Sequence, residues 1–289
     1  MIERAFFFDH AGERLCAVAT LPDSGKADIG VVMLHGWTTY RIGPHRFFVK
    51  LARRLAERGV ASIRFDTRGR GDSTGDHRET TLDSMIDDTV AAGRQLAELA
   101  DTSRIVYAGL CSGGNVALGA ATLDPDASGV AAMSTLMFME YKGMSESVRR
   151  TSHYGKEYLK KVFRAETWKK LFRGAIRFDR IRRVLFGHYG KKKRLDDPRC
   201  SGRDIMADFA QADWPALFVY GDRDPEGMAS KPQFEQFCRE HGLDAEFVDV
   251  AGANHDFYSL AWEREVFERM TAWLQKRFQS GASPISSAG

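Results

Sequence analysis

The stretch Gly109-Leu110-Cys111-Ser112-Gly113-Gly114 joins two segments of different character. Residues 105–108 before it are apolar, as in a buried strand, and residues 113–121 are mostly small, as in a closely packed helix. A glycine-rich connection between a strand and a helix is typical of a sharp turn that exposes one reactive side chain at its tip. We therefore predict a nucleophile at this turn.

Two residues compete for the tip of the turn, Cys111 and Ser112. The positions two before and two after the tip need small residues, because larger side chains there would collide across the turn. With Cys111 at the tip these positions hold Gly109 and Gly113, whereas with Ser112 at the tip one of them would hold Leu110. The spacing favours Cys111 as the nucleophile. The alternative is a buried structural cysteine beside a glycine-rich turn.

Strands and helices alternate on both sides of the turn. This pattern predicts an α/β architecture, with a mostly parallel, eight-stranded sheet and helices on both faces. The predicted strands cover residues 6–8, 15–20, 29–34, 60–65, 105–108, 130–137, 216–220 and 245–250.

Two polar residues follow later strands in the chain order of a catalytic triad, with the acid before the histidine. Asp224 follows the seventh predicted strand, and Asp222 in the same turn and Glu140 after the sixth strand are alternatives for the acid. His255 follows the last predicted strand. We expect His255 to take the thiol proton of Cys111, and Asp224 to orient the histidine ring and stabilise its charged form.

A second glycine-containing turn follows the third predicted strand, at Leu34-His35-Gly36-Trp37. A tetrahedral intermediate needs N–H donors for its oxyanion. We expect the backbone N–H groups of Trp37 and Ser112 to be these donors. Gly36 is predicted to let the backbone approach the substrate, and the Trp37 ring either lines the pocket or packs in the core.

The alternation stops between residues 138 and 213. We predict a basic helical cap there, inserted after the sixth strand, with residues 1–137 and 214–278 as the core and 279–289 as a disordered tail. Residues 140–204 contain 20 Lys or Arg against 8 Asp or Glu, an excess of twelve positive charges.

A field of this sign attracts anionic partners. The candidates are an acidic acyl carrier protein, a coenzyme A phosphate or an anionic membrane surface, and the alternative is a solvated basic face. Tyr141 and Trp168 lie among the charges. We expect them to contact substrate or, alternatively, to pack the cap onto the core.

The composition is that of an ordinary globular protein, with 43% hydrophobic and 28% charged residues. No apolar run of about 18 residues predicts a membrane span, and the N-terminus lacks the pattern of a secretory signal. Four widely spaced cysteines (Cys16, Cys111, Cys200, Cys238) favour reduced thiols in the cytoplasm over a disulfide framework. The sequence shows no metal-ligand cluster, nucleotide loop or nucleic-acid motif, so we expect no metal, cofactor or nucleic acid. The oligomeric state is left open.

These motifs together resemble the α/β-hydrolase superfamily over about residues 5–278. The segment Phe65-Asp66-Thr67-Arg68-Gly69-Arg70-Gly71-Asp72-Ser73 is similar to a characteristic loop of that family, which implies a structural role for Asp66, Arg68 and Ser73. The stretch Tyr40-Arg41-Ile42-Gly43-Pro44-His45-Arg46, with the cysteine turn, resembles hydrolases encoded beside bacterial exosortase and exopolysaccharide genes. Cysteine at the nucleophile position resembles dienelactone hydrolases and some chain-releasing thioesterases.

The residues and the resemblance together favour an acyl hydrolase, a thioesterase or esterase, that forms a covalent acyl–Cys111 intermediate with an activated thioester or lactone. A thiolate is a strong nucleophile and exchanges readily with thiol leaving groups. An acyltransferase or cyclising chain-release enzyme with the same triad is the first alternative. A non-catalytic binding module on the same scaffold is the second.

Overall fold

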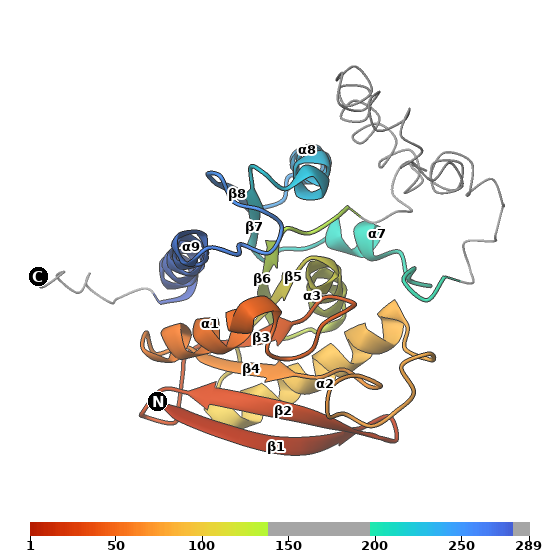
Figure 1. The fold of residues 1–289 in the computed structure, drawn as a ribbon, viewed down its shortest axis with the longest axis vertical. Coiled ribbons are helices and arrows are strands. Elements are labelled where there is room, and N and C mark those ends of the chain that lie inside the picture. Colours follow the sequence, from red (N-terminus) through yellow and green to blue (C-terminus); the bar gives the residue numbers. More distant parts are fainter. Residues whose placement is uncertain (138–196, 280–289) are drawn as a thin grey trace, which may run out of the picture. The chain divides into compact units, whose positions relative to one another are not determined.

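The computed structural model describes residues 1–137 and 197–279, which form one eight-stranded sheet (Figure 1). The strand order is β1-β2-β4-β3-β5-β6-β7-β8, and β2 is antiparallel to both its neighbours while the other pairs are parallel. The mostly parallel, eight-stranded sheet predicted from the sequence is confirmed. The strands are β1 (Ile2–His10), β2 (Glu13–Leu21), β3 (Gly30–Leu34), β4 (Ala61–Phe65), β5 (Ile105–Leu110), β6 (Ala127–Met133), β7 (Ala216–Gly221) and β8 (Ala245–Val250).

Helices cover both faces of the sheet (Figure 1). The buried faces of α1 and α9 pack together against the central strands in one apolar core, while α2, α3 and α8 lie on the other face. Every residue of β3, β4, β5 and β7 is buried, as expected for parallel strands covered on both sides. The helices are η1 (Pro44–Arg46), α1 (Phe47–Ala56), α2 (Leu82–Ala100), α3 (Ser112–Leu123), α7 (Ile205–Phe209), α8 (Pro225–His241) and α9 (Leu260–Phe278).

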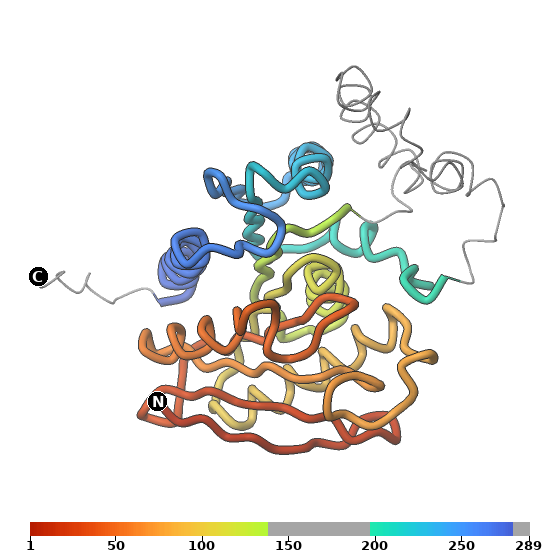
Figure 2. Tube along the Cα trace, in the orientation of Figure 1, coloured from red at the N-terminus to blue at the C-terminus, as the bar shows by residue number. Residues whose placement is uncertain are grey.

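The parallel strands bring four distant turns to one edge of the sheet. Residues 35–37 follow β3, Cys111 follows β5, Asp224 lies three residues after β7, and His255 lies five residues after β8. Figure 2 shows the path of the chain through these elements by its colour. Because parallel strands point the same way, their carboxyl ends share an edge, where ligands of open α/β sheets bind. All the predicted triad residues therefore lie on turns at this edge.

The structure differs from the sequence prediction in the residues just before β7. Residues 201–213, which we assigned to the cap, belong to the same compact unit as the sheet. The physical reason is aromatic packing. Phe209 of α7 stacks on Trp214 and on Phe237 of α8, with ring centroids 5.5 and 5.7 Å away.

Several sequence predictions fall on residues outside the described ranges. Residues 138–196 include most of the predicted cap, and residues 280–289 include most of the predicted disordered tail. Glu140, Tyr141 and Trp168 belong to this part of the chain. The roles expected for them stay predictions.

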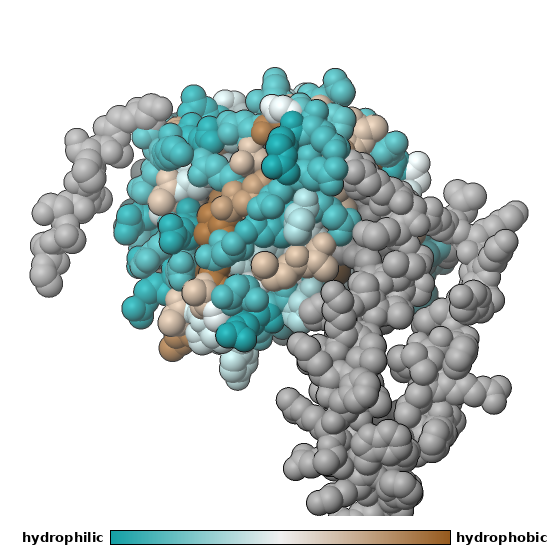
Figure 3. All heavy atoms as spheres, turned by 90° about the horizontal axis from the view of Figure 1, so that it is seen from above, coloured by the Kyte–Doolittle hydropathy of each residue, from teal (hydrophilic) through white to brown (hydrophobic). Residues whose placement is uncertain are grey.

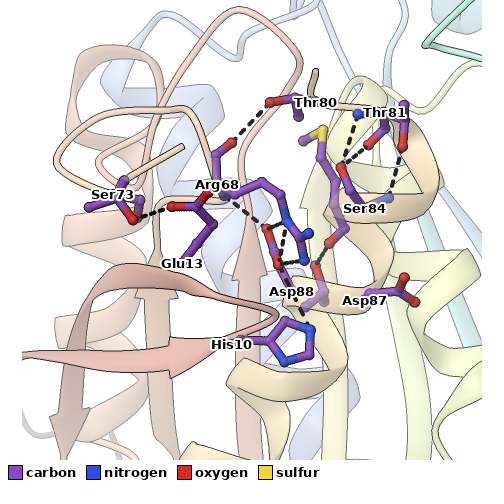
Figure 4. Close-up of polar contacts among 12 residues, drawn as sticks. His10, Glu13, Arg68, Ser73, Thr80, Thr81, Ser84, Asp87 and Asp88 are labelled. Carbon is purple, nitrogen blue, oxygen red and sulfur yellow. Dashed lines mark hydrogen bonds and ion pairs between the residues drawn. The ribbon is translucent and has the colours of Figure 1, made fainter. Parts of the chain in front are cut away.

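A buried ion pair holds the loop after β4 (Figure 4). The Arg68 guanidinium contacts the Asp88 carboxylate of α2 through Nε at 3.0 Å and through Nη2, and the Arg68 backbone N–H donates to the same carboxylate at 2.8 Å. Burial raises the pKa of Asp88 more than these contacts lower it. Thr81 is the N-cap residue of α2. Its side chain accepts from the Ser84 N–H, and the Ser84 side chain accepts from the Thr81 N–H, so the two residues cap the helix reciprocally.

The surface away from the grey atoms is mostly hydrophilic in Figure 3, with a limited band of apolar residues. In the described ranges, the most exposed large apolar side chains are Tyr258 and Leu260. No helix among the described residues is both long and apolar enough to span a bilayer.

Replacement of Asp88 by alanine should destabilise the protein by about 3 kcal/mol, because it leaves the Arg68 guanidinium without its buried partner. Chemical denaturation followed by circular dichroism measures this loss. Asp76→Ala is the matched control, since Asp76 pairs with Arg78 on the surface, and its midpoint should not move. Equal effects of the two changes would show that burial of the Arg68–Asp88 pair contributes nothing.

Candidate active site

The backbone at Cys111 takes a conformation that side chains rarely adopt, with φ 59° and ψ −127°. Cys111 joins β5 to α3, and Ser112 is already the first residue of the helix. A methyl group added at Gly109 would lie 2.0 Å from the Gly113 carbonyl oxygen, and one added at Gly113 would lie 2.4 Å from the Leu34 carbonyl oxygen. The tip of the turn is therefore Cys111 rather than Ser112, and both flanking glycines are required by space.

The side chains of His255 and Asp224 meet across the turns that follow β8 and β7. His255 Nδ1 lies 2.8 Å from Asp224 Oδ2. Asp224 is buried and begins α8, where its other carboxylate oxygen accepts from the Glu226 N–H at 3.2 Å. Pro225 occupies the first helical position, which needs no N–H donor. The helix start thus holds the carboxylate toward the histidine ring.

The charges of this pair stabilise one another. Burial lowers the pKa of His255, but hydrogen bonds to Asp224 and to Cys111, together with their charges, raise it to about 11. Burial raises the pKa of Asp224, but the hydrogen bond and charge of His255 and the N–H groups at the start of α8 leave it below its ordinary value. The raised pKa of His255 favours its charged form, an imidazolium placed between the Asp224 carboxylate and the Cys111 side chain. A cation beside a thiol favours the thiolate, which is the nucleophilic form.

Short contacts fix the loop that carries His255. The Arg223 N–H donates to the Ala253 carbonyl at 2.9 Å, and Gly221 allows this approach because a methyl there would lie 2.3 Å from the same oxygen. From the other side, His45 Nε2 lies 2.8 Å from the carbonyl oxygen of Asp256. The residue that follows His255 is thus connected to η1, the short helix that precedes α1.

The alternative acids are not placed at the histidine. Asp222 Oδ1 accepts from the Gly252 N–H at 2.7 Å and so braces the loop rather than the His255 ring. Glu140 lies outside the described residues. Among the described carboxylates, Asp224 is the one that contacts His255.

The expected oxyanion donors are only partly available, and this corrects the sequence prediction. The Trp37 N–H, predicted to face the substrate, donates instead to the Ser112 hydroxyl at 2.7 Å. The Ser112 N–H has no acceptor among the described residues. Gly36 lies beside Ser112 and Cys111, since a methyl group added at Gly36 would lie 3.4 Å from Ser112 Oγ and 3.7 Å from Cys111 Cβ.

Two residues near this turn were missed from the sequence. His35 is buried, and it holds Gly36 through Nδ1 at 2.9 Å while burial lowers its pKa, so it acts as a neutral structural residue. The Arg70 guanidinium lies over the Trp37 ring, 4.9 Å from its centroid, and burial lowers its pKa. Arg70 Nε and Nη2 are buried and have no hydrogen-bond partner within residues 1–137 and 197–279. The arginine-rich loop after β4 was the available signal.

One group of described side chains and one surface hollow lie away from the candidate triad. Cys16, Asp66 and Asp72 lie close enough together to hold an ion, but the Arg41 guanidinium pairs with both carboxylates. A surface hollow lined by Arg58 and Arg104 lies where β3 and β5 begin, at the opposite edge from Cys111. Neither feature adjoins the Cys111–His255 pair.

The comparisons with known proteins agree with this architecture. Residues 31–269 match the profile of the alpha/beta hydrolase family. The fold is similar to dienelactone hydrolase from Anabaena variabilis, with 15% identity, a TM-score of 0.62, and 96% of this chain and 98% of that chain covered. It is also similar to an esterase from Pyrococcus furiosus, with 18% identity, a TM-score of 0.64, and coverage of 96% and 91%.

A third similar structure is Est1E from Butyrivibrio proteoclasticus with ferulic acid bound. The identity is 19%, the TM-score is 0.62, and 96% of this chain and all of that chain are covered. At these identities the likeness concerns the fold. A search of curated protein sequences gave no match.

Removal of the Asp224 charge should weaken folding in a pH-dependent way. The pKa of His255 is about 11 in the fold, raised by Asp224 and Cys111, and about 6.5 in an unfolded chain. While Asp224 is ionised, these contacts stabilise the fold fully below pH 6.5, and their contribution declines as the pH rises toward 11. Asp224→Asn should therefore cost more stability at pH 6 than at pH 10, as measured by urea denaturation.

Asp222→Asn serves as the control, because Asp222 contacts a backbone N–H and no histidine. Its effect should be the same at both pH values. A pH-independent loss in Asp224→Asn would mean that the His255–Asp224 pair carries no net charge coupling.

Proposed function

The chain belongs to the alpha/beta hydrolase family, and on that premise we propose that it is an acyl hydrolase, a thioesterase or esterase with a Cys111–His255–Asp224 triad. The observation that supports this most directly is the strained turn at Cys111 beside the 2.8 Å contact between His255 and Asp224. A reactive sulfur, a base and an orienting carboxylate form the constellation of covalent acyl transfer.

The reaction proceeds in two displacement steps. The Cys111 thiolate attacks the carbonyl carbon, and the carbonyl electron pair moves onto the oxygen to form a tetrahedral oxyanion. Collapse re-forms the carbonyl and breaks the bond to the leaving group, which takes a proton from His255. His255 then takes a proton from water, whose oxygen attacks the acyl–Cys111 thioester, and the second collapse releases the acid. The Cys111 thiolate released in this step pairs again with the protonated His255.

Cysteine suits activated acyl donors. Transfer from a thioester to Cys111 exchanges one thioester for another, so little free energy is lost in the first step. Lactones with good leaving groups are equally suited. The acyl–cysteine remains activated, and for this reason amine or alcohol acceptors would give transfer or cyclisation in place of hydrolysis.

An anionic substrate fits the charges near the site. Arg68 and Arg41 are paired with carboxylates. The Arg70 guanidinium lies over the Trp37 ring, and two of its buried nitrogens have no partner in the part of the chain that the structure describes. The twelve excess positive charges of residues 140–204 add a basic segment to the same chain. We propose a substrate carried by an acidic acyl carrier protein or coenzyme A, or one with an acidic group of its own. The four free cysteines suit a reducing compartment, and we place the protein in the cytoplasm.

Cys111→Ala should lower turnover by about 10⁴-fold or more, because no nucleophile remains. The assay is intact-mass trapping across a panel of thioesters, lactones and oxyesters, in which the wild-type chain gains one acyl group on Cys111. Cys111→Ser should retain a trace of activity. Full activity in Cys111→Ala would contradict the nucleophile assignment.

The same assay separates the alternatives. When an amine or alcohol acceptor is added to the trapped acyl-enzyme, the yield of acylated acceptor is compared with the yield of free acid. A larger yield of acylated acceptor would make the protein an acyltransferase. A non-catalytic binding module would show neither an acyl adduct nor His255-dependent labelling of Cys111 by a thiol-directed electrophile.

Arg70→Gln should lower kcat/KM for an acidic thioester such as a succinyl thioester by about 10-fold to 100-fold, the range of one charge-assisted hydrogen bond. The neutral butyryl thioester of similar length should be hydrolysed at nearly the wild-type rate. Arg58→Gln removes the same charge at the opposite edge of the sheet and is the matched control. Equal losses for both thioesters would assign Arg70 to packing against Trp37 alone.

A further inference from the structure

The Ser112 hydroxyl occupies an unusual position beside the nucleophile. Its oxygen accepts a hydrogen bond from the Trp37 N–H at 2.7 Å, and among the described residues its proton has no acceptor. Ser112 is the residue directly after Cys111, and its Oγ and the Cys111 Cβ both border Gly36. A hydroxyl with one fixed lone pair and an unused proton therefore lies next to the reacting sulfur.

A serine with a purely structural role commonly donates its hydroxyl proton to an acceptor within the protein. Some hydroxyls on helices donate to a carbonyl, as Thr89 does to Met85 at 2.6 Å and Thr122 to Gly119 at 2.9 Å, whereas the capping hydroxyl of Ser259 accepts the Trp262 N–H. Among the described residues the Ser112 hydroxyl likewise accepts a backbone N–H and donates to no protein group, but it does so on the residue beside the nucleophile. Because the Trp37 N–H holds one lone pair, the O–H bond is turned away from Trp37 and is polarised by that contact.

We infer that the Ser112 side chain is a donor to the oxyanion, with its hydroxyl proton hydrogen-bonded to the oxygen and the Trp37 N–H supporting the hydroxyl from behind. The Ser112 backbone N–H supplies the second donor. Trp37 thus acts through Ser112 and does not itself contact the oxyanion. The inference rests on the proposed acyl-transfer function, since an oxyanion forms only when Cys111 attacks a carbonyl.

Two reactions of the same sulfur test this role. Acylation of Cys111 by p-nitrophenyl butyrate passes through an oxyanion, whereas alkylation of Cys111 by iodoacetamide is a displacement at a saturated carbon and forms none. A donor to the oxyanion therefore affects the first reaction alone. A residue that only shapes the turn affects both.

Ser112→Ala should slow single-turnover acylation by about 100-fold, the lower range for loss of one oxyanion donor, while alkylation stays within about two-fold of wild type. Ser112→Thr, which keeps the hydroxyl, should recover most of the acylation rate. Thr122→Ala, at the far end of α3, removes a hydroxyl of the same helix and should leave both rates unchanged.

Four results would overturn the inference, and the last of them overturns the proposed function as well. Unchanged acylation in Ser112→Ala would show that the hydroxyl proton is not used. Faster acylation would show that the hydroxyl blocks the Trp37 N–H, and a parallel loss of alkylation would show a structural role. If the wild-type chain itself forms no acyl–Cys111 adduct with any ester or thioester while alkylation proceeds, the proposed function fails and this inference fails with it.

Discussion

The strained backbone at Cys111 is the constraint on which the site depends. A residue with φ 59° and ψ −127° costs on the order of 1–3 kcal/mol, and it persists only where its surroundings determine it. Here the Cys111 N–H is bonded to the Met133 carbonyl of β6 at 2.8 Å, and α3 begins at once on the other side. Gly109 and Gly113 allow the two elements to approach so closely. The surrounding fold therefore determines the strained conformation that places Cys111 at this edge of the sheet.

The second half of the site is assembled from turns that are remote from Cys111 in sequence. Asp224 is both the N-cap residue of α8 and the hydrogen-bond partner of His255, so one side chain fixes the start of a helix and the position of a histidine ring. Desolvation alone would neutralise each of these groups, and their pairing reverses that tendency in both. The result is a preformed charge arrangement that needs no rearrangement before a substrate arrives.

Much of this could be predicted from the sequence because the signals are local. Apolar runs give the strands, and the spacing of Gly109 and Gly113 around Cys111 gives the tip of the turn. The contact between Trp37 and Ser112 could not be predicted, because it joins residues 75 positions apart and depends on which way one hydroxyl rotates. That Arg70 pairs with no carboxylate among the described residues likewise depends on tertiary contacts, because Asp66, Asp72 and Asp88 pair with Arg41 and Arg68. The place of residues 201–213 was misjudged because the stacking of Phe209 is a tertiary contact.

The pairing of β6 with β7 brings together strands separated by residues 134–215. Loop-closure entropy rises only with the logarithm of length, so each doubling of such an excursion costs about 0.6 kcal/mol. The intervening polypeptide can therefore lengthen, shorten or be exchanged over evolution at small thermodynamic expense to the sheet. The rate of folding is affected more than the stability. Cys111 leaves the ribosome long before Asp224 and His255, and the sheet cannot be completed until its last strands have been synthesised.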